Sequence, residues 1–380
     1  MKRTEVSKIV CIADVRLTER LEAEADRMGL RETYSTRGKQ VAIKARSVWK
    51  PFGRHFSMAE SPSDLIRFYV PRQHERAAMI RLATAADLYL PGRGSIFAED
   101  VVLIGDGISP WDEAKLCADQ PSWVMENRME PSPYDMIYCI VQRGRGGELA
   151  RAMLEMGLCV PIVSFGEGMG MRDRLGLLRI TIPQEKEILL FVVPPGDSDF
   201  VMDVAVRKAG LHEPGNGFLC RVPVRALAVN ARMNLDRRKH VATMEQVIST
   251  LDQLRGSTDW RRMTAAAQRH RGADVQGLMR FTLICEEGTS SVHVRAALDA
   301  GAGGATLSLL SRRAPDPHEG EEEVAMVSRA RECCDLVIPC ALKEHIEEAV
   351  IRTGLFAEPA NGFIETGPVH DAVAGTGKPS

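Results

Sequence analysis

The chain has 380 residues, of which 44% are hydrophobic and 26% are charged, the composition of an ordinary globular protein. Its 49 lysines and arginines nearly balance its 51 aspartates and glutamates, which leaves a formal net charge of −2. No large positive field would attract a phosphate backbone, so we expect no nucleic-acid partner.

The nine cysteines indicate a reducing compartment, because their number is odd, no Cys-x-x-Cys pair occurs and several lie in apolar runs such as 9–12 and 137–140. Cysteines and histidines show no metal-ligand spacing, so we expect no metal. The apolar run after residue 5 is too short for a signal peptide, and no stretch approaches the ~20 apolar residues of a membrane span. We expect a cytoplasmic protein that is not an integral membrane protein.

Three parts of the chain share the same landmarks. Residues 213–218 read Glu-Pro-Gly-Asn-Gly-Phe, residues 358–363 read Glu-Pro-Ala-Asn-Gly-Phe, and residues 90–95 are a weaker version. A second landmark is a glycine that closes an amphipathic run after a short apolar stretch, at Gly29, Gly157 and Gly301. The two landmarks keep the same order and similar spacing, which indicates three divergent copies of one unit.

The best-preserved copy predicts six elements. Apolar or alternating runs indicate strands, and apolar residues at helical spacing indicate helices. The predicted order is strand 136–142, helix 148–156, strand 160–165, strand 188–193, helix 200–209 and strand 218–222. This βαββαβ order is that of the ferredoxin-like unit. We therefore predict an α/β (α+β) fold of three ferredoxin-like units.

The landmarks also divide the chain into repeats and linkers. Apolar residues recur at helical spacing between 241 and 254, which indicates a helix between the second and third copies. We place repeat 1 at 5–105, a linker at 106–134, repeat 2 at 135–229, a helical linker at 230–277, repeat 3 at 278–374 and a tail at 375–380.

The order of elements, with a Gly-x-Gly turn entering the last strand and Pro-Val closing it, resembles the PII nitrogen-regulatory superfamily. Residues 185–190 and 210–217 of repeat 2 carry the resemblance best. It implies units packed about a threefold axis, nucleotide clefts between neighbours, and a long inter-strand loop that contacts a protein target. Three copies in one chain imply a monomeric pseudo-trimer with three non-equivalent clefts.

The sequence departs from the PII pattern where that family binds phosphates. The family has a lysine directly after the turn, whereas this chain has Phe218, Phe363 and, loosely aligned, Ser95. Binding of ATP therefore does not carry over, and no cofactor is assigned. We expect a small anionic or nucleotide-like metabolite, and the resemblance alone implies a role in nitrogen metabolism.

The candidate ligand contacts lie in the two glycine-containing turns, at 213–218 and 358–363, and just after the predicted strand 136–142. Glycine and asparagine leave backbone N–H groups open to oxyanions, but they equally suit a tight turn into a strand. The turn candidates are Gly215, Asn216, Gly217, Asn361 and Gly362. Arg143 and Arg145 precede a predicted helix, whose dipole would help them attract an anion. Two solvated arginines in a flexible turn are the alternative.

These residues leave more than one function open. A ligand-sensing regulator that signals through its inter-strand loops is the first, and a scaffold with empty clefts is another. The main alternative is an enzyme, namely a hydrolase of a small amide or heterocycle in one specialised cleft. Its candidate catalytic residues are Glu167, Glu185 and Lys186, of which the last two also suit a solvated strand start. No signature motif of a named reaction occurs.

Overall fold

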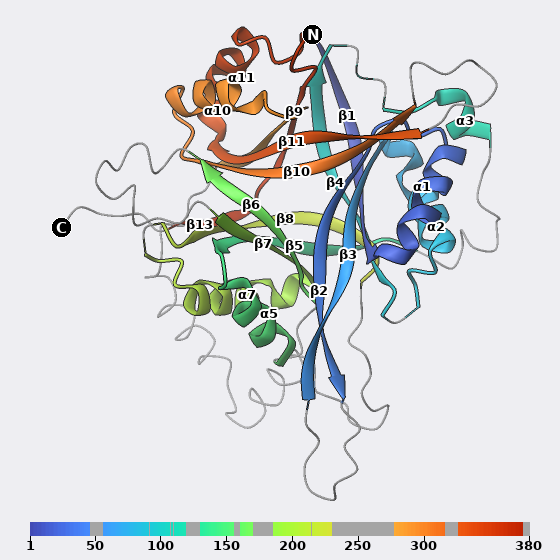
Figure 1. The fold of residues 1–380 in the computed structure, drawn as a ribbon, viewed down its shortest axis with the longest axis vertical. Coiled ribbons are helices and arrows are strands. Elements are labelled where there is room, and N and C mark those ends of the chain that lie inside the picture. Colours follow the sequence, from blue (N-terminus) through green and yellow to red (C-terminus); the bar gives the residue numbers. More distant parts are fainter. Residues whose placement is uncertain are drawn as a thin grey trace, which may run out of the picture.

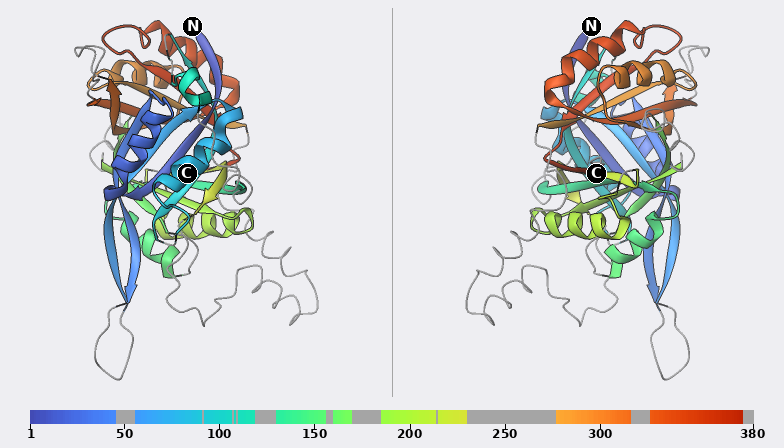
Figure 2. Two further views of the ribbon diagram at one scale, coloured as in Figure 1. Left: turned by 90° about the vertical axis from the view of Figure 1, so that its right-hand side faces the viewer. Right: turned by 90° about the vertical axis from the view of Figure 1, so that its left-hand side faces the viewer.

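Strands dominate the structure, and the helices lie outside one strand assembly (Figures 1 and 2). The helical linker predicted at 230–277 lies outside the described residues except for Gly277, and the tail at 375–380 lies outside them entirely. The computed structural model describes residues 1–45, 56–90, 92–106, 108, 110–118, 130–155, 160–169, 185–213, 215–229, 277–315 and 326–374.

The order strand, helix, strand, strand, helix, strand occurs three times. The first run comprises β1 (Lys2–Asp14), α1 (Thr18–Arg27), β2 (Thr33–Ala45), β3 (Phe56–Val70), α2 (Glu75–Ala85) and β4 (Gly94–Gly105), followed by α3 (Glu113–Ala118). The second comprises β5 (Ser132–Gln142), α5 (Gly146–Glu155), β6 (Ile162–Met169), β7 (Glu185–Val193), α7 (Pro195–Ala209) and β8 (Gly217–Ala228). The third comprises β9 (Leu278–Glu286), α10 (Ser290–Asp299), β10 (Ala305–Pro315), β11 (Met326–Pro339), α11 (Lys343–Arg352), β12 (Phe363–Pro368) and the short β13 (Asp371–Ala374).

The elements of the second run overlap the predicted ones, because the apolar patterns that locate them are local. Single 3-10 turns lead into three of the helices elsewhere in the chain. These turns are η1 (Val15–Leu17), η2 (Arg72–His74) and η4 (Cys340–Leu342).

All thirteen strands formed by the described residues belong to one antiparallel sheet that closes on itself. Neighbouring strands follow the order β10-β11-β9-β12-β4-β1-β3-β2-β6-β7-β5-β8-β13. Further pairings, β10–β2, β10–β6 and β4–β8, join strands that are distant in this order. The result is a closed antiparallel β-barrel with the helices outside (Figure 1).

The predicted architecture is therefore wrong. We expected three ferredoxin-like units that pack as a PII-like pseudo-trimer with clefts between them. Instead, β2 is hydrogen-bonded to β6 and β10, and β4 is hydrogen-bonded to β8 and β12. Backbone hydrogen bonds thus join strands from all three parts of the chain into one barrel. The regulatory role in nitrogen metabolism, which depended on the PII resemblance, loses its basis.

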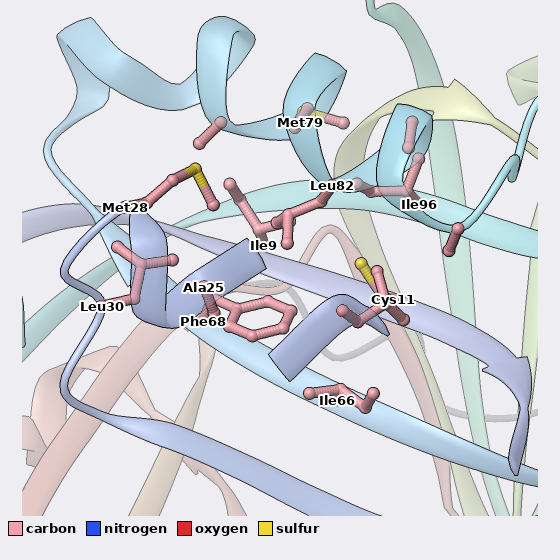
Figure 3. Close-up of a cluster of buried hydrophobic side chains, with 14 of the residues drawn as sticks. Ile9, Cys11, Ala25, Met28, Leu30, Ile66, Phe68, Met79, Leu82 and Ile96 are labelled. Carbon is pink, nitrogen blue, oxygen red and sulfur yellow. The ribbon is translucent and has the colours of Figure 1, made fainter. Parts of the chain in front are cut away.

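Successive side chains of each strand face either the helices or the barrel interior. In β1, Ile9 and Cys11 point into a core that α1 and α2 cover, together with Phe68 and Met79 (Figure 3). Two similar cores lie beneath α5 and α7 and beneath α10 and α11. Because full burial of one large apolar side chain contributes about 1.5–3 kcal/mol, these cores hold the helix pairs against the barrel.

A strand carboxylate also fixes the start of one helix in each run. The pairs are Asp64 with the Thr18 hydroxyl (2.6 Å), Glu187 with the Gly146 N–H (2.6 Å) and Glu332 with the Ser290 N–H (2.9 Å). A negative charge at a helix N-terminus is favourable because it meets the positive end of the helix dipole. The three contacts therefore orient α1, α5 and α10 on the outside of the barrel.

Candidate functional site in the barrel interior

The barrel interior has an apolar wall and a polar wall. Strands β5, β7 and β8 contribute mainly apolar side chains, including Ile140, Leu190 and Val222. The other wall carries ionisable and hydroxyl groups, of which Arg67 and Asp335 are half-buried and the rest are buried, namely Lys8, Tyr69, Glu99, Arg280, Thr282, Cys333 and Glu365; Tyr138 of β5 reaches Asp335 from across the interior. Buried ionisable groups are uncommon in a protein core and gather at functional sites, so the polar wall is the candidate site.

Four charged side chains of this wall form a closed ion-pair network. The Lys8 ammonium lies 2.6 Å from Glu99 and also contacts Glu365. The Arg280 guanidinium lies 2.5 Å from Glu99 and 3.1 Å from Glu365. Burial alone would raise the pKa of Glu365, but the charges of Lys8 and Arg280 lower it to about 2. Two cations and two carboxylates thus neutralise each other.

Arg67 has a much weaker set of partners. Its Nη1 atom donates a hydrogen bond to the Cys333 sulfur at 3.4 Å, its one acceptor in the part of the chain that the structure describes. A guanidinium carries five N–H donors. The nearby Asp335 carboxylate instead accepts hydrogen bonds from the hydroxyls of Tyr138, at 3.0 Å, and Thr282, at 2.7 Å. Arg67 is therefore a charged group of the interior with a neutral sulfur as its partner.

The protonation states of this pair follow from their surroundings. Burial would lower the pKa of Arg67, but the negative charge of the neighbouring Asp335 raises it above its ordinary value, so the side chain is charged. Burial raises the pKa of Cys333 to about 12, so its thiol is protonated at neutral pH. A protonated thiol is a poor nucleophile.

Two side chains of the apolar wall are slightly more exposed than their helix-facing neighbours. Along β7, Leu189 and Phe191 face the helices and are 0% exposed, whereas Leu190 faces the interior and is 7% exposed. Along β5, Cys139 is 0% exposed and Ile140 is 8% exposed. The side chains of the apolar wall therefore keep surface that a small ligand could cover.

The predicted anion site at the start of α5 has protein carboxylates as partners. The Gly146 N–H in the first turn of α5 donates to Glu187, and Arg143 pairs with Glu185 at 2.6 Å on the surface. Arg145 is exposed beside them. The structure thus gives Arg143 and the helix start other partners, and ligand binding by Arg143 and Arg145 stays a prediction.

The glycines of the predicted turns lie where the last strand of a run passes the first. A Cβ atom at Gly217 would be 2.0 Å from the Ile140 carbonyl oxygen, and one at Gly362 would be 2.7 Å from that of Ile284. Real Cβ atoms do not come this close to an oxygen. Close strand approach therefore explains both glycines, in agreement with the tight-turn interpretation.

The asparagines of the turns also make structural contacts. The Asn216 side chain donates to the Gly210 carbonyl at 3.0 Å and accepts from Gln142 at 3.2 Å, and Gln142 also donates to the Gly215 carbonyl at 3.3 Å. Asn361 has a φ of 40°, a left-handed conformation that asparagine tolerates well. These contacts tie the turn to the end of α7 and to β5.

The three candidate catalytic residues are neighbours in the β6–β7 ladder. Glu167 lies opposite Glu185, and Lys186 lies opposite Gly166. Opposite residues share a face of the sheet and successive residues alternate, so both glutamates lie on one face and Lys186 on the other. The structure therefore brings the carboxylates together but separates them from the lysine, and a catalytic role stays a prediction.

The sequence did carry a signal for the interior site that our predictions missed. Lys8, Arg67 and Arg280 each interrupt an otherwise apolar strand, as in Leu-Ile-Arg-Phe-Tyr-Val at residues 65–70. A charged residue within a buried strand needs a buried partner. The partners lie on other strands, so no fixed spacing along the chain identifies them.

The described residues contain neither a metal-binding cluster nor a membrane-spanning helix. No group of three or more His, Cys, Asp or Glu side chains there could hold a metal ion. No helix among them is long and apolar enough to span a membrane. No family model, curated protein or solved structure matches the chain. The geometry of the interior is therefore the basis for a functional proposal.

Proposed function

We propose that the protein binds a small organic carboxylate inside the barrel, with Arg67 as its anchor. The observation that carries this proposal is the partner of Arg67, a neutral sulfur. Lys8 and Arg280, the other cations of the polar wall, each contact two carboxylates. A ligand carboxylate would give Arg67 the paired hydrogen bonds that its planar group is suited to make.

The rest of the interior suits the non-polar part of such a ligand. Small-molecule sites are mostly apolar and contain a few placed polar groups. Here Ile140, Leu190 and Val192 supply buried apolar side chains across the barrel from the polar wall. The protonated state of Cys333 favours binding over covalent chemistry at this position.

Calorimetric titration tests the proposal with two pairs of probes, butyrate with butyramide and benzoate with benzamide. The acids should bind and the amides should not, because only the acids carry the charge that Arg67 matches. In Arg67→Leu the affinity should fall by about 10- to 100-fold, the equivalent of the ~1.5–3 kcal/mol of a charged hydrogen bond. Leucine is a suitable replacement, because it occupies the equivalent position in the second run. There Leu190 of β7 lies opposite Tyr138 of β5, as Arg67 of β3 lies opposite Val10 of β1.

Two controls separate binding from folding. Arg143→Leu removes an exposed arginine of similar size and should leave the affinity unchanged. Arg67→Lys keeps the charge and should retain part of the affinity even if Arg67→Leu unfolds. Equal binding by wild type and Arg67→Leu, or binding of neither acid by the wild type, would refute the proposal.

A further inference from the structure

Strands β2, β6 and β10 pair with one another in a triangle. Strand β10 pairs with β6 through Ala305–Leu307 and with β2 through Ser311–Arg313, and β2 pairs with β6 through residues 38–40. Each of the three strands thus pairs with both of the others, and the short segments between the paired residues surround the place where the three strands meet. One residue with a hydroxyl group lies at or beside each of these stretches, namely Thr36, Ser164 and Ser308.

The three hydroxyl residues face the interior. Thr36, Ser164 and Ser308 are buried, whereas the residues that follow them (Arg37, Phe165 and Leu309) are 73%, 50% and 55% exposed. Because side chains alternate along a strand, this contrast places the hydroxyl residues on the inner face. Each also lies opposite an inner-wall residue of the next strand, in the pairs Thr36–Leu65, Ser164–Ile188 and Ser308–Cys333.

One of these hydroxyls has no hydrogen-bond partner. Thr36 Oγ1 is buried and makes no hydrogen bond within the described residues. A buried hydroxyl without a partner destabilises the fold unless something bonds to it. Ser308 is only weakly bonded, to the Cys333 carbonyl at 3.5 Å. Cys333 is also the residue whose sulfur contacts Arg67, and Tyr34, the neighbouring inner-face residue to Thr36 on β2, lies opposite Arg67, so Ser308 and Thr36 border the same part of the interior as the arginine.

We infer that the ligand is a monocarboxylate with a second, uncharged oxygen, such as a 2-oxo or 2-hydroxy acid. This inference depends on the proposed function, because Arg67 would hold the carboxylate. The hydroxyls of Thr36, Ser164 and Ser308 would meet the second oxygen. They carry no charge, Lys8 and Arg280 already contact two carboxylates each, and the buried Arg331 is paired with Glu286, so a second ligand carboxylate would lack a free counter-ion among these three cations.

Titration with butyrate, 2-oxobutyrate, 2-hydroxybutyrate and succinate tests the inference. The wild type should bind the 2-oxo or the 2-hydroxy acid about 3- to 10-fold more tightly than butyrate, as one added neutral hydrogen bond allows. Succinate should bind no better than butyrate. Thr36→Val has nearly the same shape without the hydroxyl, so it should fold normally and lose this preference while it still binds butyrate.

Matched variants make the outcome clear. Ser35→Ala removes a hydroxyl from the neighbouring, outward position of β2 and should keep the preference. If Arg67→Leu weakens butyrate binding but Thr36→Val, Ser164→Ala and Ser308→Ala all keep the wild-type preference, the inference fails and the proposed function stands. Tighter binding of succinate than of 2-oxobutyrate also overturns the inference. If no acid binds the wild type, both proposals fail.

Discussion

The Gly217→Ala variant should be strongly destabilised before any ligand is added. Gly217 has a φ of 151°, a conformation that side chains rarely adopt, and its Cβ would lie 2.0 Å from the Ile140 carbonyl oxygen. An unfavourable backbone conformation costs about 1–3 kcal/mol, and steric overlap in a packed region costs about 1–3 kcal/mol more. We therefore expect a loss of about 2–6 kcal/mol in the free energy of unfolding, a large part of the stability of a typical protein.

Gly147→Ala is the matched control, since it makes the same chemical change in the same part of the chain. A Cβ at Gly147 would have nothing within 4 Å, and the residue lies in α5, where alanine is favoured over glycine by up to about 1 kcal/mol. Urea unfolding followed by circular dichroism should separate the two variants. If Gly217→Ala is as stable as Gly147→Ala and only ligand binding changes, then the turn serves a ligand and our explanation of the glycine is wrong.

Three other variants test the remaining contacts by unfolding experiments. Glu365→Gln should lower stability by about 3–5 kcal/mol, because it leaves the two buried cations, Lys8 and Arg280, with Glu99 as their one shared carboxylate in this network. A loss below 1 kcal/mol would contradict the closed network. Glu187→Ala should lower the free energy of unfolding by about 1–2 kcal/mol, because the Gly146 N–H at the start of α5 loses its carboxylate acceptor. Glu185→Ala on the surface should have little effect. Equal losses of stability in the two variants would argue against the helix contact. Burial lowers the pKa of His293, so the folded state disfavours its protonation and stability should fall as the pH drops below about 6.5, the pKa in the unfolded chain. His293→Gln should reduce this pH dependence, and an unchanged slope would assign it to other groups.

Local elements were predictable from the sequence, but their assembly was not. The runs at 136–142 and 188–193 identified β5 and β7 because burial on both faces leaves an apolar pattern within a few residues. The closure of the barrel depends on contacts such as that of Ser35 with Ser311, which pair polar residues far apart in the chain. Nothing in the local pattern of either strand specifies that partner.

The candidate site was missed for a related reason. Our predictions favoured glycine-rich turns because their backbone groups suit anions, yet Gly217 and Gly362 are explained by close strand packing. The anchor proposed from the structure, Arg67, lies within an apolar strand and was recognisable only as a charge in an unusual place. That its hydrogen-bond acceptor among the described residues is a sulfur rather than a carboxylate becomes evident only when neighbouring strands are known.

The closure of the sheet has a consequence for biosynthesis. Strands β2 and β4 leave the ribosome long before their partners β10 and β12, which are made only after the whole second run of elements. Until then both strands have unpaired edges, which are templates for association with other chains. Long-range pairing also slows folding, because a long loop must close before the contact forms. A chain truncated before β10 should therefore aggregate rather than form a smaller barrel, and the full chain should depend on chaperones more than a helical protein of equal length.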